Sequence, residues 1–159
     1  MDVGQRGHDR IGVEGVGGVR GADRERRAAG RPRREQPGRR VLHHDRETDF
    51  YVLAHVQEGN KVGKPHSHGT SWAVYGNARA FTEMTEWRRT NPESEPHAVL
   101  QAASKYRLGP GDTKAYGPGV IHSTAHPEKA WVIRVTGTDL DHLPRFRFDP
   151  RKDKIVEKV

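Results

Sequence analysis

Three histidines stand at a spacing that could hold a metal ion. His66 and His68 are two residues apart in KPHSHGTSW, and His122 follows in GPGVIHST, directly after a Gly-Pro-Gly turn. Alternate side chains of a strand point to the same face, so His66 and His68 can reach one ion from one direction. Three neutral imidazoles suit iron, zinc, copper or nickel, and they leave coordination positions open for water, dioxygen or substrate.

Positioning His122 beside the other two requires a fold that brings distant segments together. From about residue 41 the chain consists of short runs rich in β-forming residues, separated by turn signals such as EGNKVGKP and GPGD. Many short strands at regular intervals predict an all-β sandwich or barrel. We expect strands at residues 50–57, 70–76, 98–108 and 130–140, with edge strands at 144–149 and 154–158.

The composition divides the chain into two segments. Eleven arginines and no aromatic residue lie in residues 1–40, whereas all the aromatic residues lie in residues 41–159. The first segment cannot bury enough apolar surface to offset its backbone entropy, so we expect residues 1–40 to be a disordered Arg/Gly-rich tail. Residues 41–159 are expected to form one barrel domain.

Charge, cysteine content and hydropathy limit the partners and the compartment. The formal net charge of +7 comes mostly from the tail, so nucleic-acid binding is not expected except through the tail. The absence of cysteine excludes disulfides, thiolate metal sites and cysteine nucleophiles. No apolar run approaches the length of a membrane span and no signal-peptide pattern stands at the N-terminus, so no membrane contact and a cytoplasmic location are expected.

The histidine segments resemble the two motifs of the cupin superfamily. The first motif stands as Gly59 followed by His66-Ser67-His68, and the second as Gly111-DTKAY-GPGVIHSTAH, where Gly119 and His122 fall on the family positions and Pro118 stands one place late. The resemblance covers roughly residues 59–126. It implies a single cupin barrel (a double-stranded β-helix, or jelly roll) with a divalent metal held by His66, His68 and His122.

One departure from the motif indicates which branch of the superfamily the chain resembles. Trp72 occupies the position of the family's acidic ligand, and a three-His site without that acid looks like the branch of thiol dioxygenases that includes cysteine dioxygenase. That branch implies mononuclear Fe(II) and oxidation of a small substrate by dioxygen, with Zn, Ni or Mn as other metals. However, the Ser-x-His-x-Tyr run of thiol dioxygenases is absent, since the corresponding strand reads RVTGTDL. Arg40 falls loosely where the family's substrate-carboxylate arginine stands.

Several other residues are candidates for the pocket. Trp72 shares strand parity with the HxH pair and should face the cavity, whereas Tyr75 has the opposite parity and should pack outside it. Tyr116 could offer a hydroxyl to a bound oxygen species. Arg134 could bind a substrate carboxylate or face solvent, and His55 could be a pocket acid/base or a structural histidine.

The charged run that contains Glu83, Glu86 and Arg88 is interpreted as a solvated strand edge.

Three functions remain open at this point. The first is an Fe(II)-dependent dioxygenase acting on a small anionic molecule, with Tyr116 and Arg134 as catalytic residues and Trp72, Arg40 and His55 as substrate-binding residues. The second is a non-catalytic module that binds a small ligand or a metal, and the third is a Zn- or Mn-dependent isomerase or hydrolase. The partners are then a small-molecule substrate and dioxygen, and a homodimer is compatible with such a barrel although no residue specifies it.

Overall fold

The computed structural model describes residues 38–149 and 154–158, all of which belong to one compact unit, Glu35–Val159. The first strand, β1, begins at Arg39, two residues before the start of the barrel predicted from the sequence. The tail predicted for residues 1–40 lies, up to residue 37, outside the described residues.

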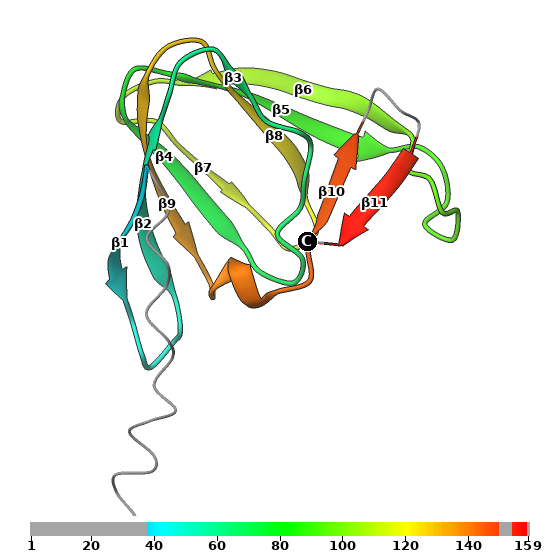
Figure 1. The fold of residues 1–159 in the computed structure, drawn as a ribbon, viewed down its shortest axis with the longest axis horizontal. Helices are drawn as coiled ribbons and strands as arrows, with labels where there is room; N and C mark the ends of the chain where they lie inside the picture. Colours follow the sequence, from blue (N-terminus) through cyan, green and yellow to red (C-terminus); the bar gives the residue numbers. More distant parts are fainter. Residues whose placement is uncertain (1–37, 150–153, 159) are drawn as a thin grey trace, which may run out of the picture. The chain divides into compact units, whose positions relative to one another are not determined.

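A five-stranded antiparallel sheet forms one wall of the fold (Figure 1). In spatial order its strands are β1 (Arg39–His44), β2 (Tyr51–Gln57), β9 (Ala130–Thr136), β4 (Ala73–Arg79) and β7 (Thr113–Tyr116). The sequences of β2 and β9, YVLAHVQ and AWVIRVT, are rich in the β-branched and aromatic residues that favour a pleated sheet. These two strands pair along seven residues, so they form the centre of this wall.

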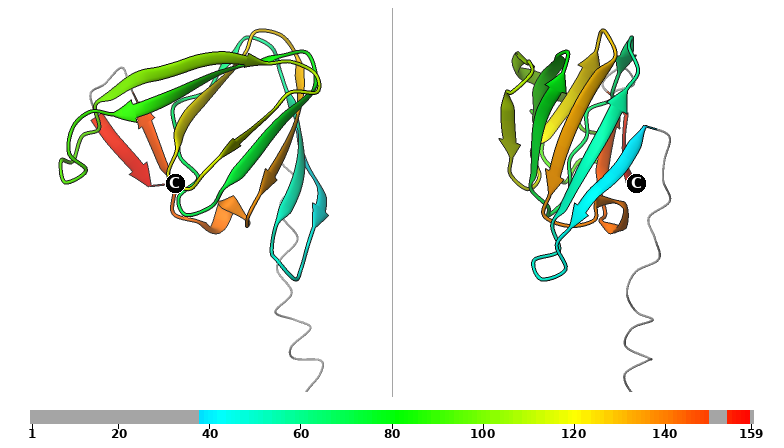
Figure 2. Two further views of the ribbon diagram at one scale, coloured as in Figure 1. Left: turned by 180° about the vertical axis from the view of Figure 1, so that it is seen from behind. Right: turned by 90° about the vertical axis from the view of Figure 1, so that its left-hand side faces the viewer.

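A four-stranded antiparallel sheet forms the opposite wall, as the two views of Figure 2 show. Its strands are, in spatial order, β3 (Lys61–Val62), β8 (Ile121–His126), β5 (Thr82–Arg89) and β6 (Leu100–Leu108). The segment at 98–108, whose composition would also suit a helix, is therefore a strand as predicted.

The chain crosses between the two walls at almost every connection. It passes from β2 to β3, back to β4 and over to β5, and only the β1–β2 and β5–β6 connections stay within one sheet. This winding of eight strands, β2 to β9, into two facing antiparallel sheets is the jelly roll found in cupins. The predicted all-β cupin fold is thus confirmed.

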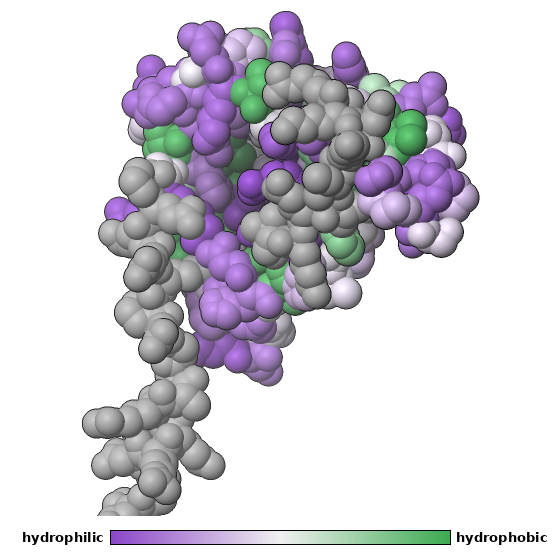
Figure 3. All heavy atoms as spheres, turned by 45° about the vertical axis from the view of Figure 1, so that its right-hand side comes forward, coloured by the Kyte–Doolittle hydropathy of each residue, from purple (hydrophilic) through white to green (hydrophobic). Residues whose placement is uncertain are grey.

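Side chains that point between the walls form the core. On β4, Ala73, Tyr75 and Asn77 are buried whereas the residues between them are only half-buried, which is the alternation expected of a strand with one covered face. Leu53 and Met84 add fully buried side chains from β2 and β5. On the face seen in Figure 3, hydrophilic side chains predominate and the hydrophobic ones lie in small separate patches.

The chain ends in a short helical turn and a hairpin. The 3-10 turn η2 (Leu140–His142) follows β9 and buries Leu140, and the hairpin consists of β10 (Phe146–Asp149) and β11 (Lys154–Lys158). The backbone of β10 also pairs with residues 65–67, through the N–H of Ser67 and the carbonyl of Pro65. Within the described residues, no helix is long and apolar enough to cross a membrane.

Candidate metal centre

Backbone hydrogen bonds place His66 directly beside His122. The N–H of His66 donates to the carbonyl of His122 at 2.9 Å, and the N–H of His122 donates to the carbonyl of His66 at 3.0 Å. Two residues that exchange both hydrogen bonds in this way present their side chains on the same face of an antiparallel pair. This pairing explains how residues more than fifty positions apart reach one site, as the barrel interpretation required.

The HxH segment is extended but is not part of a regular strand. His66 forms an isolated bridge to β8, and Ser67 bonds to β10 on the other side. Behind them the chain turns at Gly69, whose φ of 60° is in the left-handed region that favours glycine. The Gly69 carbonyl accepts a hydrogen bond from the N–H of Gly119 at 2.9 Å, so the two histidine-bearing segments are joined at a second point.

The three imidazoles converge, and hydrogen bonds of Nδ1 leave Nε2 available in His66 and His122. Nδ1 of His66 lies 3.1 Å from the Lys64 carbonyl, and Nδ1 of His122 lies 3.4 Å from the Val120 carbonyl, so each of these nitrogens donates to its carbonyl. The proton is then on Nδ1, and the lone pair is on Nε2. Potential ligand atoms of His66, His68 and His122 all lie within 4.8 Å of one another.

Burial keeps these imidazoles neutral. His68 and His122 are almost completely buried, with 2% and 0% of their surface exposed. Burial lowers the pKa of His66 to about 4, that of His68 to about 2 and that of His122 to about 3. The positive charge of Arg134 lowers the pKa of all three further.

A divalent metal fits this donor set. Neutral imidazole is the protonation state that binds a metal, and hydrogen bonds from Nδ1 to backbone carbonyls are the usual way of orienting such ligands. No carboxylate belongs to the cluster, so the bound ion would retain its full positive charge. The site is therefore able to bind iron, zinc, nickel or manganese, and the donor types do not choose among them.

A cavity of about 180 Å³ borders the triad at His66. His55 from β2 and Arg134 from β9 line it, together with Tyr75 from β4. Arg134 pairs across the sheet with Leu53 and with Tyr75, whose side chains are buried between the walls, so Arg134 also points inward and not to solvent. Its Nε is buried and has no hydrogen-bond partner among the described residues.

Further positive charge lies on the other side of His66. Arg145 and Arg147 line a neighbouring hollow of about 360 Å³ with His66 itself. Burial lowers the pKa of Arg145, the carboxylate of Asp141 raises it, and Arg134 and Arg147 lower it again. Nε of Arg145 is also buried without a partner in the described part of the chain. The triad is therefore surrounded by guanidinium groups, which favour an anion nearby.

Tyr116 lies against the triad. Its ring stacks on that of His122 with centroids 4.3 Å apart, and only 3% of its surface is exposed. Its hydroxyl points away from the imidazole nitrogens, to the hydroxyl of Tyr106 at 2.5 Å, and Tyr106 donates to Glu86 at 2.8 Å. Lys114 lies 3.3 Å from the same Glu86 oxygen, so a hydrogen-bonded chain runs from Tyr116, whose ring packs on His122, to a partly exposed ion pair.

The strand-edge interpretation of Glu86 is therefore wrong. Strand β5 lies between β8 and β6, not at an edge, and Glu86 stands directly opposite the inward-facing His122. Glu83, whose parity is opposite when counted along β5, forms a surface ion pair with Arg107. The charge run looked like a solvated edge because the sequence does not show which strands pair.

The predicted orientations of Trp72 and Tyr75 are both wrong, because Trp72 lies outside the cavity and Tyr75 faces it. The turn in which the N–H of Ser71 bonds to the carbonyl of His68 interrupts the alternation between the HxH pair and β4. Trp72 consequently lies outside the cavity, 42% exposed and packed against Gly137, where no side chain would fit. Tyr75 instead points inward, and its hydroxyl lies 3.2 Å from Nε2 of His68 and 3.4 Å from Nε2 of His122.

Arg40 is not brought to the triad. It is exposed and pairs with Ala54, on the face of the sheet opposite to that of His55. Its neighbour Arg39 has the inward parity but is engaged by Asp141 through two hydrogen bonds of 3.2 and 2.7 Å. Of the predicted substrate-binding residues, the structure thus places only His55 on the cavity beside the triad.

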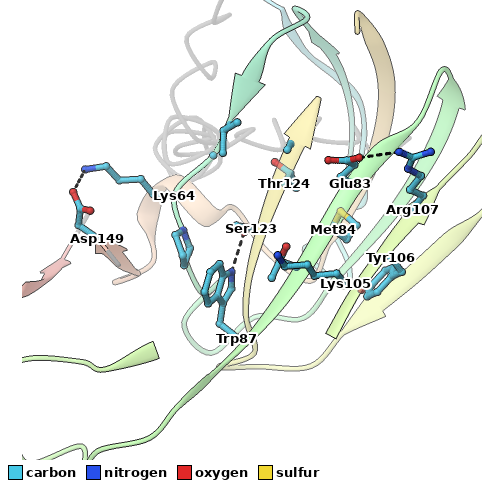
Figure 4. Close-up of a pocket in the computed structure, with 15 residues that line it drawn as sticks. Lys64, Glu83, Met84, Trp87, Lys105, Tyr106, Arg107, Ser123, Thr124 and Asp149 are labelled. Atoms are coloured by element: carbon cyan, nitrogen blue, oxygen red, sulfur yellow. Dashed lines mark hydrogen bonds and ion pairs between the residues drawn. The ribbon is translucent and has the colours of Figure 1, made fainter. Parts of the chain in front are cut away.

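A larger hollow of about 760 Å³ lies on the outer side of the four-stranded sheet, shown in Figure 4. None of the three histidines lines it. Six of its polar residues are paired with one another: Lys64 with Asp149, Arg107 with Glu83, and the indole N–H of Trp87 with Ser123. The cavity at the triad, where Arg134 lacks a partner for its Nε, is the better candidate site.

Comparisons with known proteins do not assign a function to this chain, so its interpretation depends on its fold and its site. No family model matches the chain, and no curated protein matches its sequence. Similar solved structures include KdgF from Halomonas sp., with 20% identity, a TM-score of 0.48 and coverage of 68% of this chain and 86% of that one.

Two further similar structures are a double-stranded β-helix protein from Klebsiella pneumoniae and a cupin superfamily protein from Desulfitobacterium hafniense. The first has 16% identity and a TM-score of 0.48, and the match covers 75% of this chain and 90% of that one. The second has 11% identity and a TM-score of 0.46, with 64% and 76% covered. At such values the likenesses carry no functional argument.

Proposed function

We propose that this protein is a metal-dependent cupin enzyme, a mononuclear Fe(II) dioxygenase that acts on a small anionic substrate. The observation that supports this proposal is the combination of three buried neutral imidazoles with an inward-facing guanidinium on one small cavity. A purely structural metal would need neither a cavity beside it nor an arginine in that cavity.

Each part of the site has a role in this proposal. Iron(II) held by His66, His68 and His122 would supply open binding positions and the electrons that dioxygen needs. Arg134 binds an anionic group of the substrate, because its buried Nε has no partner in the described part of the chain and a guanidinium pairs well with a carboxylate. His55, on the same cavity, contacts the substrate beside it.

Tyr116 positions His122 and holds a proton. Burial raises the pKa of the Tyr116 hydroxyl, so it remains protonated and donates its hydrogen bond to Tyr106. Burial also raises the pKa of Tyr106, to about 12, and Tyr106 passes the hydrogen bond on to Glu86. A proton can move along this chain between Tyr116 and the Glu86–Lys114 pair.

That same chain supports a second candidate function. A metal-assisted isomerase or hydrolase needs a route for protons more than it needs dioxygen, and the tyrosine pair linked to Glu86 provides one. In this case zinc or manganese would act as a Lewis acid. The dioxygenase needs dioxygen as a substrate, whereas the isomerase or hydrolase does not.

Oxygen consumption separates the candidates. The iron-loaded protein is screened in an oxygen electrode against small thiols and small carboxylic acids, with His122→Ala as the metal-site control and Arg134→Met as the anion-site control. The dioxygenase proposal expects uptake that is abolished in His122→Ala and that needs higher substrate concentrations in Arg134→Met. Turnover of the same compounds under argon, by the zinc or manganese form, would support the second candidate against the first.

A further inference from the structure

The buried hydroxyl of Tyr75 has an unusual environment. It lies 3.2 Å from Nε2 of His68 and 3.4 Å from Nε2 of His122, and 7% of the Tyr75 surface is exposed. The hydrogen bond of His122 Nδ1 to the Val120 carbonyl leaves Nε2 of His122 free for a metal, so the tyrosine oxygen lies beside the expected position of the ion and not behind the histidines.

These distances are those expected between ligands of one ion. Two donor atoms each about 2.1 Å from a metal are about 3.0 Å apart at an octahedral angle and about 3.4 Å apart at a tetrahedral angle. The separations of the Tyr75 oxygen from both Nε2 atoms fall within that interval. The same distances also suit hydrogen bonds, which is what the hydroxyl makes when no ion is bound.

Metal binding removes those hydrogen bonds. Once the lone pairs of His68 Nε2 and His122 Nε2 point at an ion, neither nitrogen can accept a proton from Tyr75. The hydroxyl carries one proton, and this buried group would then lose its acceptor, which is unfavourable unless the oxygen takes up another interaction. The ion itself is the partner within reach.

The donor set also lacks the acid that usually completes such a site. No carboxylate belongs to the cluster, and Trp72, which stands at the acid's place in the motif, lies outside the cavity. Tyr75 is the oxygen-bearing side chain that the fold places there instead, on β4 and facing inward.

We infer that Tyr75 is a fourth protein ligand of the metal held by His66, His68 and His122; this rests on the proposed metal centre but not on its dioxygenase activity. On binding, the O–H bond of Tyr75 breaks, an oxygen–metal bond forms and the proton leaves to water. The phenolate offsets one unit of the ion's charge. Two positions of a six-coordinate ion remain, one for dioxygen and one for substrate.

An optical experiment tests this ligand directly. The protein is loaded with iron, oxidised to iron(III), assayed for iron content and examined for the visible charge-transfer band of a phenolate bound to iron(III). The matched variants are Tyr75→Phe and Tyr116→Phe, since both rings pack against His122 but only the Tyr75 hydroxyl contacts imidazole nitrogens.

We expect the band in the parent and in Tyr116→Phe, and its loss in Tyr75→Phe, which still binds iron with an affinity lower by about tenfold or more. A crystal structure of the zinc-loaded parent should place the Tyr75 oxygen about 2.0–2.2 Å from the ion. Three results would overturn the inference while leaving the metal centre intact. They are an iron-loaded parent without the band, a Tyr75→Phe variant that retains the band, and a zinc–oxygen distance beyond about 3 Å. A parent that binds no metal would overturn both.

Discussion

Lowering the pH should destabilise the metal-free protein through the three buried histidines. In the unfolded chain each imidazole has a pKa near 6.5, whereas burial lowers the folded-state pKa of His66, His68 and His122 to about 4, 2 and 3. Between these values the unfolded state binds more protons than the folded state, so the free energy of unfolding falls as the pH falls. The loss begins near pH 6.5 and ends only below the folded-state pKa values.

The size of the effect follows from the same values. Between pH 7 and pH 6, each histidine that is neutral when folded and titrates at pH 6.5 when unfolded removes about 0.7 kcal/mol, so the three together remove about 2 kcal/mol. Urea unfolding of the metal-free protein at the two pH values measures this difference together with the contribution of His126, whose pKa burial also lowers.

Two variants control for other titrating groups. His122→Gln should reduce the loss by about a third, to roughly 1.3 kcal/mol, whereas replacement of the exposed His97 by Gln should leave it unchanged. Because the slope is compared and not the absolute stability, a less stable variant remains informative. A stability that stays constant or rises between pH 7 and pH 6, or a slope that His122→Gln does not alter, would refute the argument that the triad is buried in its neutral form.

Three further results are expected. Gly69→Ala should lower the free energy of unfolding by about 1–3 kcal/mol, because Gly69 has a φ of 60° and the added methyl would meet the Pro144 carbonyl. Gly117→Ala, which has open space around it, should change the free energy of unfolding by less than about 0.5 kcal/mol. Urea titration compares the two variants, and equal losses would contradict the reasoning. Arg134→Met should leave the free energy of unfolding within about 1 kcal/mol of the parent value or raise it, because it removes a guanidinium whose buried Nε has no partner among the described residues. A thermal unfolding scan that shows a larger loss would indicate a structural role for Arg134. Tyr106→Phe should lower the free energy of unfolding by about 1–2 kcal/mol, because the buried Tyr116 hydroxyl loses its partner while Glu86 keeps its ion pair with Lys114. An unchanged urea midpoint would show that the tyrosine chain is not formed.

The sequence allowed the convergence of His66, His68 and His122 and the positions of most strands to be predicted. His66 and His68 could be paired with His122 because their motif spacing is local, and the period-2 pattern of runs such as YVLAHVQ is a property of each strand alone. Both kinds of signal depend on residues that are close together in the chain.

Orientation across a turn could not be predicted in the same way. The alternation rule was applied from His68 through to Trp72 and Tyr75, but the turn between residues 68 and 71 shifts the phase, so the two aromatic side chains exchange sides. No single residue in GTSW shows that shift, because Gly69 combines its left-handed φ with a close approach to Pro144, which is distant in the sequence.

The sequence also did not show which strands lie side by side. Glu86 became a site residue only because β5 pairs with β8, which places it opposite His122, and Arg145 reaches His66 from a segment that follows the last barrel strand. Such proximities arise from long-range pairing. The isolated charge in TEMTEWRR was a signal that could have prompted an inward assignment, since Thr82, Met84 and Glu86 alternate with the residues between them.

The central claim is that His66, His68 and His122 bind one metal ion, and elemental analysis tests it most directly. Protein purified without a histidine tag is compared with His66→Ala, His122→Ala and, as a matched control at an exposed histidine, His97→Ala, before and after reconstitution with Fe(II). We expect about one metal ion per chain in the parent and the control, and its loss in the two triad variants. A parent that holds no stoichiometric metal even after reconstitution, or triad variants that retain it, would contradict the assignment.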